Sequence, residues 1–419
     1  MGTAVAKMYE YARERYAAIG VDADAAIDRM LRVDVSMHCW QGDDVGGFEQ
    51  TNMAGGGIMA TGNYPGRART GDELRRDVER AMSLVPGRHR LNLHAIYAET
   101  EGRRIERDKL EACHFSRWID WAREKELGLD FNGTFFGHPL AANGFTLANH
   151  DQHVRNFWIE HGRACRRIAA AMGSALGRTC IHNIWIPDGY KDVPADQRSP
   201  RERLAQSLDE ILRESLPTAA VRDAVESKLF GLASESYVVG SHEFYLGYAI
   251  RKNIELCLDS GHFHPTESIA GKLSAVLCHL PRILLHISRG VRWDSDHVPL
   301  FSDEVREITQ QVVRGGYLDR VDIAADWFDA TINRIASWII GLRNIRKGLL
   351  SAMLEPFEML CACERDGDYT TRLALQEELK TMPFSLVWDY ACERAGMPYG
   401  AAWLDEVRDY EKRELGRRA

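Results

Sequence analysis

The chain has 419 residues, of which 45% are hydrophobic and 27% charged, a composition that excludes disordered and fibrous proteins. Its formal net charge of −8 disfavours attraction to a phosphate backbone, so we expect no nucleic-acid partner. The length suits two or three average domains, or one large α/β barrel with an appendage.

Cysteine usage and hydropathy indicate the compartment. The nine cysteines are odd in number, scattered, and mostly surrounded by apolar residues, which favours reduced thiols in a cytoplasmic protein. The N-terminal residues contain no apolar signal core. The longest apolar stretch, 269–287, is interrupted by Lys272, His279, Pro281 and Arg282. Such a segment cannot cross a bilayer, so we expect no membrane association.

The periodicity of apolar residues predicts the order of elements. Residues 3–32 have helical spacing, with Gly20 between two predicted helices. Eight strand-like runs then alternate with segments of helical periodicity: 35–40, 90–97, 128–136, 179–187, 224–231, 255–263, 282–289 and 320–329. Eight such alternations predict an α/β fold, a (β/α)8 TIM barrel.

Beyond residue 329 the pattern is helical to the end of the chain. We therefore predict an N-terminal helical segment at 1–34, the barrel at 35–350 and a C-terminal helical extension at 351–419. Apolar stripes at helical spacing in the tail are typical of core or subunit contacts. We read the extension as a candidate for oligomerisation.

One long loop, 42–69, contains the glycine-rich sequence GGGIMATGNYPGRA. A loop of this length in a compact domain is either functional or simply flexible. It could close as a lid over a site or lie on the surface, and the sequence leaves both interpretations open. It is not a familiar phosphate-binding loop, because it lacks a Gly-Lys-Ser/Thr ending and a G-x-G-x-x-G pattern.

Acidic and imidazole side chains gather late in the strand-like runs, most densely between residues 259 and 296. In a barrel, catalytic groups project from the C-terminal strand ends. Asp294 and Asp296 are separated by one residue and can face one cation, and His262 adds a nitrogen ligand. This donor set suits Mn²⁺, Mg²⁺ or Co²⁺ better than thiolate-seeking ions.

Other strand ends offer further ligands: Glu226, Asp259, His286 and Asp329. A lone buried carboxylate is costly unless it is paired or metal-bound, so their convergence predicts a second cation. These four residues would fill the coordination positions of one metal ion. His262, Asp294 and Asp296 would leave coordination positions of the other ion open for substrate. A single His or Asp near a strand end is more often a hydrogen-bonded loop residue, but joint occurrence on neighbouring strands favours the metal.

Lys228 lies two residues after Glu226, so in a strand both side chains point to the same side. Its ammonium could hydrogen-bond a sugar hydroxyl or a developing oxyanion, or form a salt bridge within the site. Further candidates for substrate binding lie late in their runs: Trp40, His94, Phe131 and Trp185. The aromatic side chains could form an apolar wall against a sugar, although an aromatic at such a position is by default part of the core.

These residues lie in segments that resemble the L-rhamnose isomerase family over nearly the whole chain. The segments are VSMHCWQGDDV at 35–45, GNYPG at 62–66, RLNLHAIY at 90–97, NIWIPDG at 183–189, VESKLFG at 225–231, LDSGHFHPTE at 258–267, VRWDSDHV at 291–298 and FDATINR at 328–334. The resemblance implies a metal-dependent aldose–ketose isomerase that interconverts L-rhamnose and L-rhamnulose in rhamnose catabolism. It also implies a cytoplasmic homotetramer of barrels with helical extensions.

Carried over by position, the resemblance assigns roles to the candidate residues. A catalytic ion, usually Mn²⁺, would be held by His262, Asp294 and Asp296, and a structural ion, Zn²⁺ or Mn²⁺, by Glu226, Asp259, His286 and Asp329. Lys228 would stabilise developing charge and Asp329 would move a proton between sugar oxygens. The resemblance favours a metal-assisted hydride shift between C2 and C1, and an enediol route is the rival.

Two other classes of function compete with this hypothesis. A barrel with similar ligands could be a metal-dependent hydrolase or a DNA-repair endonuclease, but the acidic charge balance argues against DNA. A non-catalytic sugar-binding protein would normally carry an export signal and would not need an open divalent site. The small-molecule sugar isomerase is therefore the preferred prediction.

Overall fold

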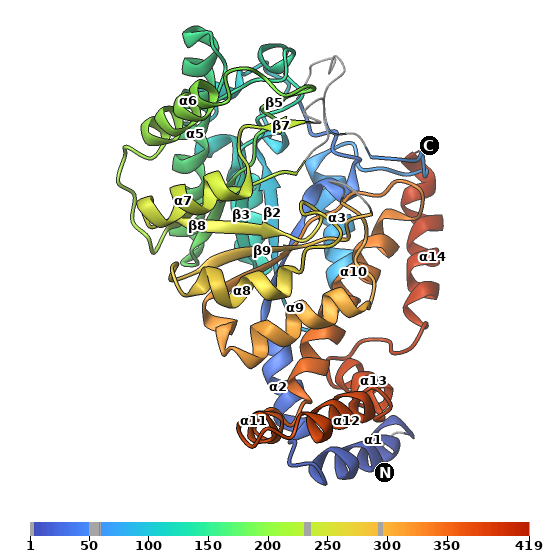
Figure 1. The fold of residues 1–419 in the computed structure, drawn as a ribbon. Helices are drawn as coiled ribbons and strands as arrows, with labels where there is room; N and C mark the ends of the chain where they lie inside the picture. The colour runs from blue at the N-terminus through green and yellow to red at the C-terminus, as the bar shows by residue number, and fades with distance from the viewer. Residues whose placement is uncertain (1–3, 50–57, 59, 230–235, 292–295, 419) are drawn as a thin grey trace.

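Eight parallel strands close into a barrel in the computed structural model, which describes residues 4–49, 58, 60–229, 236–291 and 296–418 (Figure 1). The strands are β1 (Asp34–His38), β2 (Arg88–His94), β3 (Gly128–Asn132), β4 (Cys180–Ile184), β6 (Val221–Glu226), β8 (Glu255–Asp259), β9 (Ile283–Ile287) and β10 (Val321–Ala325). Every neighbouring pair is parallel, and β1 pairs with both β2 and β10. The predicted (β/α)8 fold is confirmed. A small antiparallel sheet, β5 (Gly189–Tyr190) with β7 (Tyr237–Val238), lies outside the barrel.

Amphipathic helices connect the strands and cover the barrel. They are α3 (Gly71–Met82), α4 (Ser116–Glu124), α5 (Gln152–Leu176), α6 (Arg198–Ile211), α7 (His242–Lys252), α8 (Ile269–Leu277), α9 (Asp303–Arg314) and α10 (Arg334–Met353). Helix α9 illustrates the pattern, because Val305, Ile308 and Val312 are buried at helical spacing. Short 3₁₀ helices occupy several loops: Cys39–Gly42, Ala95–Tyr97, Arg107–Lys109, Ala112–Phe115, Pro139–Ala141, Tyr317–Asp319 and Leu415–Arg418.

The barrel interior is layered because alternate residues of each strand point inward. A small apolar cluster forms the middle layer: Ile181, Ala224, Cys257, Leu284 and Ala324. Two residues further along three of these strands come Glu226, Asp259 and His286, at the C-terminal ends. Two positions before four of the five layer residues, at the opposite end, lie charged residues: Arg222, Glu255, Arg282 and Asp322. The apolar layer therefore separates two polar layers. One lies at the N-terminal ends of the strands, the barrel floor, and the other at their C-terminal ends, the barrel mouth.

The chain ends form a helical subdomain beside the barrel (Figure 1). It contains α1 (Ala4–Ala17), α2 (Ala23–Arg32), α11 (Phe357–Arg365), α12 (Tyr369–Leu379), α13 (Phe384–Arg394) and α14 (Trp403–Arg413). Tyr9 of α1 stacks on Tyr390 of α13 with ring centroids 3.9 Å apart. Helix α14 returns to the barrel, where Tyr410 donates a hydrogen bond to Asp77 of α3 at 2.7 Å. The predicted boundary at residue 350 falls inside α10, and the three-part division stays a prediction.

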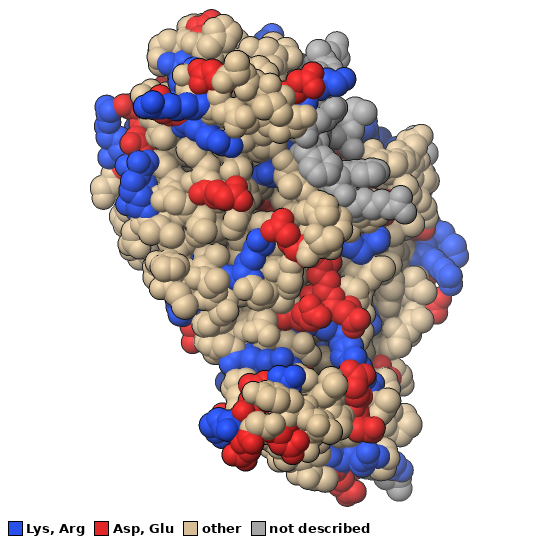
Figure 2. All heavy atoms as spheres, viewed as in Figure 1, with Lys and Arg blue, Asp and Glu red and all other residues tan. Residues whose placement is uncertain are grey.

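The outer surface carries both signs of charge. On the face shown in Figure 2, Lys and Arg side chains are interspersed with Asp and Glu side chains. Within the described ranges, no helix is both long enough and apolar enough to cross a membrane.

Candidate active site

Four buried side chains converge at the C-terminal ends of neighbouring strands: Glu226 from β6, Asp259 from β8, His286 from β9 and Asp326 directly after β10. The Nδ1 atom of His286 lies 3.4 Å from Glu226 Oε1, 3.5 Å from Asp259 Oδ2 and 3.4 Å from Asp326 Oδ2. One atom from each residue lies within 4.8 Å of the others, a spacing that could hold a metal ion. We call these four residues the strand-end group.

Three members of the strand-end group were predicted, and the fourth differs. The structure brings Asp326 into the group instead of Asp329, because β10 ends at Ala325 and the next inward-facing residue is Asp326. The Oδ1 atom of Asp329 accepts hydrogen bonds from the backbone N–H and the hydroxyl of Thr331, at 2.7 and 2.6 Å. Asp329 lines the neighbouring cavity instead, where it can face a substrate.

A second candidate metal group contains Asp259, His262 and Asp296. Nδ1 of His262 is 3.0 Å from the Ser227 carbonyl oxygen, and Nε2 is 3.3 Å from Asp296 Oδ1. Two of the three predicted catalytic-ion ligands, His262 and Asp296, therefore lie together. The third, Asp294, lies outside the described residues. Asp259 belongs to both groups, so the two candidate sites are adjacent.

The electrostatics of these groups favour a cation. Several buried ligand atoms have no hydrogen-bond partner within the described part of the chain: Glu226 Oε1, Asp259 Oδ2, both ring nitrogens of His286, Asp296 Oδ1 and Asp326 Oδ1. Burial raises the pKa of Asp296 well above its usual range. Buried acceptors without donors are rare and costly, whereas a divalent ion would satisfy them together. The donor set is oxygen-rich with one imidazole per group, which suits Mn²⁺, Mg²⁺ or Zn²⁺.

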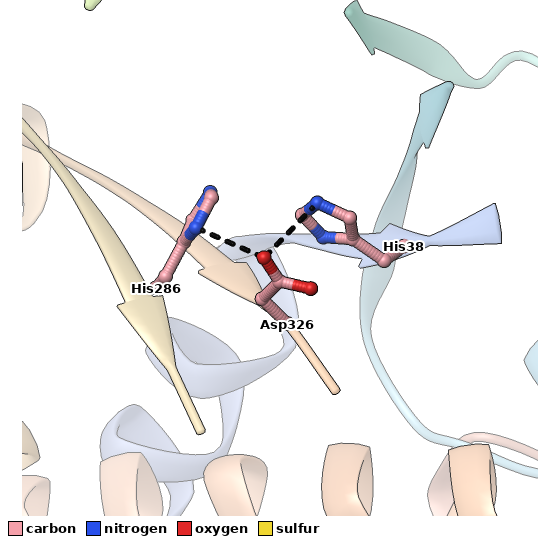
Figure 3. A group of neighbouring side chains, drawn as sticks. All are labelled: His38, His286 and Asp326. Carbon is pink, nitrogen blue, oxygen red and sulfur yellow. Dashed lines mark ion pairs between the residues drawn. The ribbon is translucent and has the colours of Figure 1, made fainter. Parts of the chain in front are cut away.

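His38 of β1 also reaches the strand-end group, although the sequence analysis did not single it out. Figure 3 shows the Asp326 carboxylate between two imidazoles, with Oδ2 3.4 Å from Nδ1 of His286 and 3.4 Å from Nε2 of His38. His38, His286 and Asp326 form a further group with metal-ligand spacing. A residue of β1 can meet the residue that follows β10 only because the barrel closes, so the sequence gives no local signal for this contact.

A cavity of about 560 Å³ opens beside both metal groups. Three predicted substrate-binding residues line it: Trp40, His94 and Trp185. Trp40 stacks on His94 with ring centroids 4.1 Å apart, and Phe136 and Phe328 extend the aromatic wall. Burial lowers the pKa of His94 well below its usual value, so its imidazole is neutral. This wall could pack against the C–H face of a sugar.

Phe131 does not line the cavity. Its ring packs edge-on against Phe115, with centroids 5.1 Å apart, and is fully buried. The neighbouring residues Asp130 and Asn132 point into the barrel, so strand alternation directs Phe131 outward. Phe136, in the loop after β3, supplies the aromatic ring that sequence reasoning assigned to Phe131.

Lys228 lies two residues beyond the end of β6 and is buried. Its Nζ atom is 5.6 Å from the ring centroid of Trp185, within range of a cation–π contact. Burial raises the pKa of Asp188 to about 6, and Lys228 is among the groups that oppose this rise. Lys228 is therefore close to Trp185 of the aromatic wall and acts electrostatically on the buried carboxylate of Asp188. A lysine in this position could stabilise negative charge.

A different cavity, of about 470 Å³, lies at the N-terminal end of the barrel. Its walls carry charges that are largely paired, such as Arg90 with Asp130 at 2.6 Å. In this fold the reactive groups come from the opposite end of the strands. The strand-end cavity is therefore the candidate active site.

Comparisons with known proteins agree on one family. The L-rhamnose isomerase family model matches residues 3–418. An L-rhamnose isomerase of Rhodopirellula baltica is 59% identical over 416 residues, covering 99% of this chain and 97% of the relative. One of Cronobacter sakazakii is 54% identical over 419 residues, covering 100% of both chains. The chain belongs to the L-rhamnose isomerase family.

The resemblance inferred from eight sequence segments is thereby confirmed. The solved structure of an L-ribulose 3-epimerase covers 76% of this chain and 95% of its own, with a TM-score of 0.49 and 15% identity. That similarity is too weak to indicate an activity. For this member of the L-rhamnose isomerase family, the full-length matches place the strand-end group, the Asp259–His262–Asp296 group and the aromatic cavity inside the matched region.

Proposed function

We propose that the protein is a metal-dependent aldose–ketose isomerase that interconverts L-rhamnose and L-rhamnulose. The observation that carries this proposal is the opening of two adjacent carboxylate–imidazole groups into an aromatic-lined cavity of about 560 Å³. The polar groups suit the hydroxyls of a small sugar, and the rings suit its apolar faces. Full-length similarity to L-rhamnose isomerases supports this sugar.

The ligand chemistry supports two divalent ions. Glu226, Asp259, His286 and Asp326 would hold a structural ion, Zn²⁺ or Mn²⁺, because all four are buried and together offer enough ligand atoms to surround it. His262, Asp296 and the predicted Asp294 would hold the catalytic ion, Mn²⁺ in our proposal. A bound divalent ion acts as a Lewis acid that stabilises negative charge on neighbouring substrate oxygens.

The chain's own residues orient the sugar and move its proton. Asp329 lines the cavity with one carboxylate oxygen engaged by Thr331, so the carboxylate is held in place for exchanging a hydroxyl proton. Lys228 lies with its Nζ over the Trp185 ring, and its positive charge would stabilise negative charge that develops at the reacting oxygens. The rings of Trp40 and Phe136 exclude water from the C–H face of the sugar.

We favour a 1,2-hydride shift over an enediol route. In a hydride shift the hydrogen passes directly from C2 to C1, so no carboxylate needs to reach the C2 proton. Deuterium retention separates the two routes: L-rhamnose labelled at C2 should give L-rhamnulose that keeps the label at C1. Exchange of the label with solvent would favour the enediol.

A ketose assay tests the proposed function. L-Rhamnose is incubated with the untreated protein, with protein treated with EDTA, and with EDTA-treated protein resupplied with Mn²⁺. We expect ketose to form, to disappear after chelation and to return with Mn²⁺. Undiminished product after chelation would contradict the metal role, and hydrolysis of a nucleic acid without any sugar turnover would replace the isomerase by the hydrolase hypothesis.

We also infer that the protein works in the cytoplasm as a homotetramer. The support is a set of exposed apolar side chains on the helical subdomain: Met8, Tyr11, Phe357, Met359, Tyr369 and Leu373. Exposed apolar surface is a candidate for subunit contacts, because large apolar patches on a soluble protein often mark interaction sites. Light scattering should give about four times the mass of one chain, and the mass of a single chain would contradict the inference.

A further inference from the structure

Two imidazoles at the barrel mouth share one arrangement. Nδ1 of His262 lies 3.0 Å from the carbonyl oxygen of Ser227, and Nε2 lies 3.3 Å from Asp296. Nδ1 of His38 lies 2.8 Å from the carbonyl oxygen of Ala325, and Nε2 lies 3.4 Å from Asp326. In both cases a backbone carbonyl lies against Nδ1 and a carboxylate faces Nε2, and in His262 the Glu226 carboxylate also lies 3.2 Å from Nδ1.

This arrangement fixes the tautomer. A carbonyl oxygen only accepts, so Nδ1 of His38 carries the hydrogen and donates it, which leaves the lone pair on Nε2. A lone pair that faces a carboxylate oxygen at 3.4 Å is unfavourable without a proton or a cation between them. Histidines that bind metals characteristically donate the other N–H to a carbonyl or carboxylate, as His38 does.

The alternative is a hydrogen-bonded core histidine. The amides of Asn92 and Asn132 lie 3.3 and 3.5 Å from Nε2 of His38. Both distances are long for a hydrogen bond, and the shorter amide contact of Asn92 is with Asn132 Oδ1, at 3.2 Å. These amides hold the ring in place but satisfy the lone pair poorly.

We propose that His38 is a metal ligand: with His286 and Asp326 it forms a second seat for the ion of the strand-end group, preferred by Co²⁺, Zn²⁺ or Cu²⁺. The three side chains are buried and lie at ligand spacing (Figure 3). Both ring nitrogens of His286 and one Asp326 oxygen have no hydrogen-bond partner within the described chain. The inference rests on the strand-end site of the proposed function, not on the reaction.

The chemistry of the ligands determines which ion prefers which of the two binding positions, called seats here. The strand-end group offers three carboxylates and one imidazole, a set that suits Mn²⁺ or Mg²⁺. The His38 seat offers two imidazoles and one carboxylate, and nitrogen ligands favour ions later in the first transition series. The two seats share Asp326 and His286, so we infer that one ion chooses between them. His38 then sets the metal preference of the protein.

A competition experiment tests this with a variant and a matched control. Metal-free protein is equilibrated with equal Co²⁺ and Mn²⁺, and the bound ions are counted by mass spectrometry. His38→Gln should lower the bound Co²⁺/Mn²⁺ ratio by about tenfold or more. His161→Gln should leave it unchanged, because His161 is buried and also bonds a backbone carbonyl, that of Arg107, but its ring faces Phe135 and Trp158.

A crystal of the unmodified protein grown with Co²⁺ gives the second measurement, independent of how the variants fold. We expect an anomalous peak at about 2.1 Å from Nε2 of His38. Peaks beyond 3 Å from Nε2, together with an unchanged Co²⁺/Mn²⁺ ratio in His38→Gln, would overturn the inference. Neither result depends on sugar turnover, so failure of the L-rhamnose assay would contradict the proposed function and leave His38 to be judged separately.

Discussion

Arg222 and Asp322 form an ion pair at 2.6 Å across the barrel floor, although their strands, β6 and β10, are separated by β8 and β9. Glu255 and Arg282 complete a ring of alternating charge with them. Each ring residue precedes a member of the strand-end group by four positions: 222 and 226, 255 and 259, 282 and 286, 322 and 326. The ring therefore ties together the four strands that lead to the strand-end group.

Breaking the ring should destabilise the barrel. Among the described residues, Arg222→Met leaves Glu255, which is buried, with only the longer contact to Arg282 at 3.7 Å. Because the ring is partly exposed, we expect a loss of about 2 kcal/mol in the free energy of unfolding, between values for exposed and buried pairs. Urea unfolding measures it. Arg198→Met is the control, since that exposed residue pairs only with Glu202 in the described structure, and should cost under about 0.5 kcal/mol. Equal losses in the two variants would contradict a role for the ring.

Substitutions of Asp326 and Asp329, the two aspartates that follow β10, should have different effects on the metal content of the protein. Asp326→Asn removes a member of the strand-end group, so we expect about one fewer ion per subunit in protein purified with Mn²⁺. Asp329→Asn should keep both ions and lose about a hundredfold in kcat, because its carboxylate faces the cavity but lies outside that group. Metal analysis and the ketose assay on both variants measure this. The reverse pattern would restore Asp329 as the ligand.

The prediction of Asp329 in place of Asp326 shows which features of the site can be predicted from the sequence and which cannot. Period and alternation are local properties, so the number of barrel strands and three of the four residues of the strand-end group were predictable. The exact end of a strand depends on pairing with its neighbours. The predicted run 320–329 extended past the real end of β10 at Ala325, and the assignment therefore passed over Asp326.

Other differences have equally physical causes. The outward direction of Phe131 follows from the period of two once Asn132 is taken as inward, so the sequence contained that signal. The contact of His38 with Asp326 did not follow from any local pattern, because it depends on closure of the barrel between β1 and β10. Closure brings together residues that are 288 positions apart.

The described residues 61–64 of the glycine-rich loop are anchored beside the candidate active site. Gly62 forms a β-bridge with Ala330, and Ala330 exchanges hydrogen bonds with Thr61 and Tyr64 at 3.0 and 2.8 Å. Gly62 has a φ of +112°, and a Cβ there would lie 2.3 Å from the Ala330 oxygen. Gly62→Ala should therefore displace Thr61, which lines the cavity, and raise KM for L-rhamnose about tenfold or more.

Gly247→Ala provides the matched control for this prediction. Gly247 lies in α7, where an added Cβ would meet nothing within 4 Å, and alanine favours a helix interior over glycine. Its KM should be unchanged and its thermal stability equal or slightly higher. If Gly62→Ala kept the KM of the unmodified protein, the anchored part of the loop would have no role in binding sugar. Whether the loop moves as a lid stays a prediction.

Asp43 should make the free energy of unfolding depend on pH. Its carboxylate accepts hydrogen bonds from the hydroxyl of Tyr97 and the N–H of Gly47 at 2.6 and 2.7 Å, yet burial raises its pKa to about 7. Because the folded state holds this proton more tightly than the unfolded chain, the stabilisation is complete below pH 4 and is lost as pH rises to 7. At about 1.4 kcal/mol per pKa unit the loss amounts to about 4 kcal/mol.

The variant Asp43→Asn isolates this contribution, because the amide keeps an acceptor for Tyr97 and has no charge at any of these pH values. Other groups titrate in both proteins, so the informative quantity is the difference in unfolding free energy between the unmodified protein and the variant. We expect this difference to fall steadily between pH 4.5 and 7 and to stay level above pH 7.5, as measured by urea unfolding at half-unit steps. A difference that is constant over the whole range would mean that Asp43 remains ionised when buried, stabilised by Tyr97 and Gly47 alone.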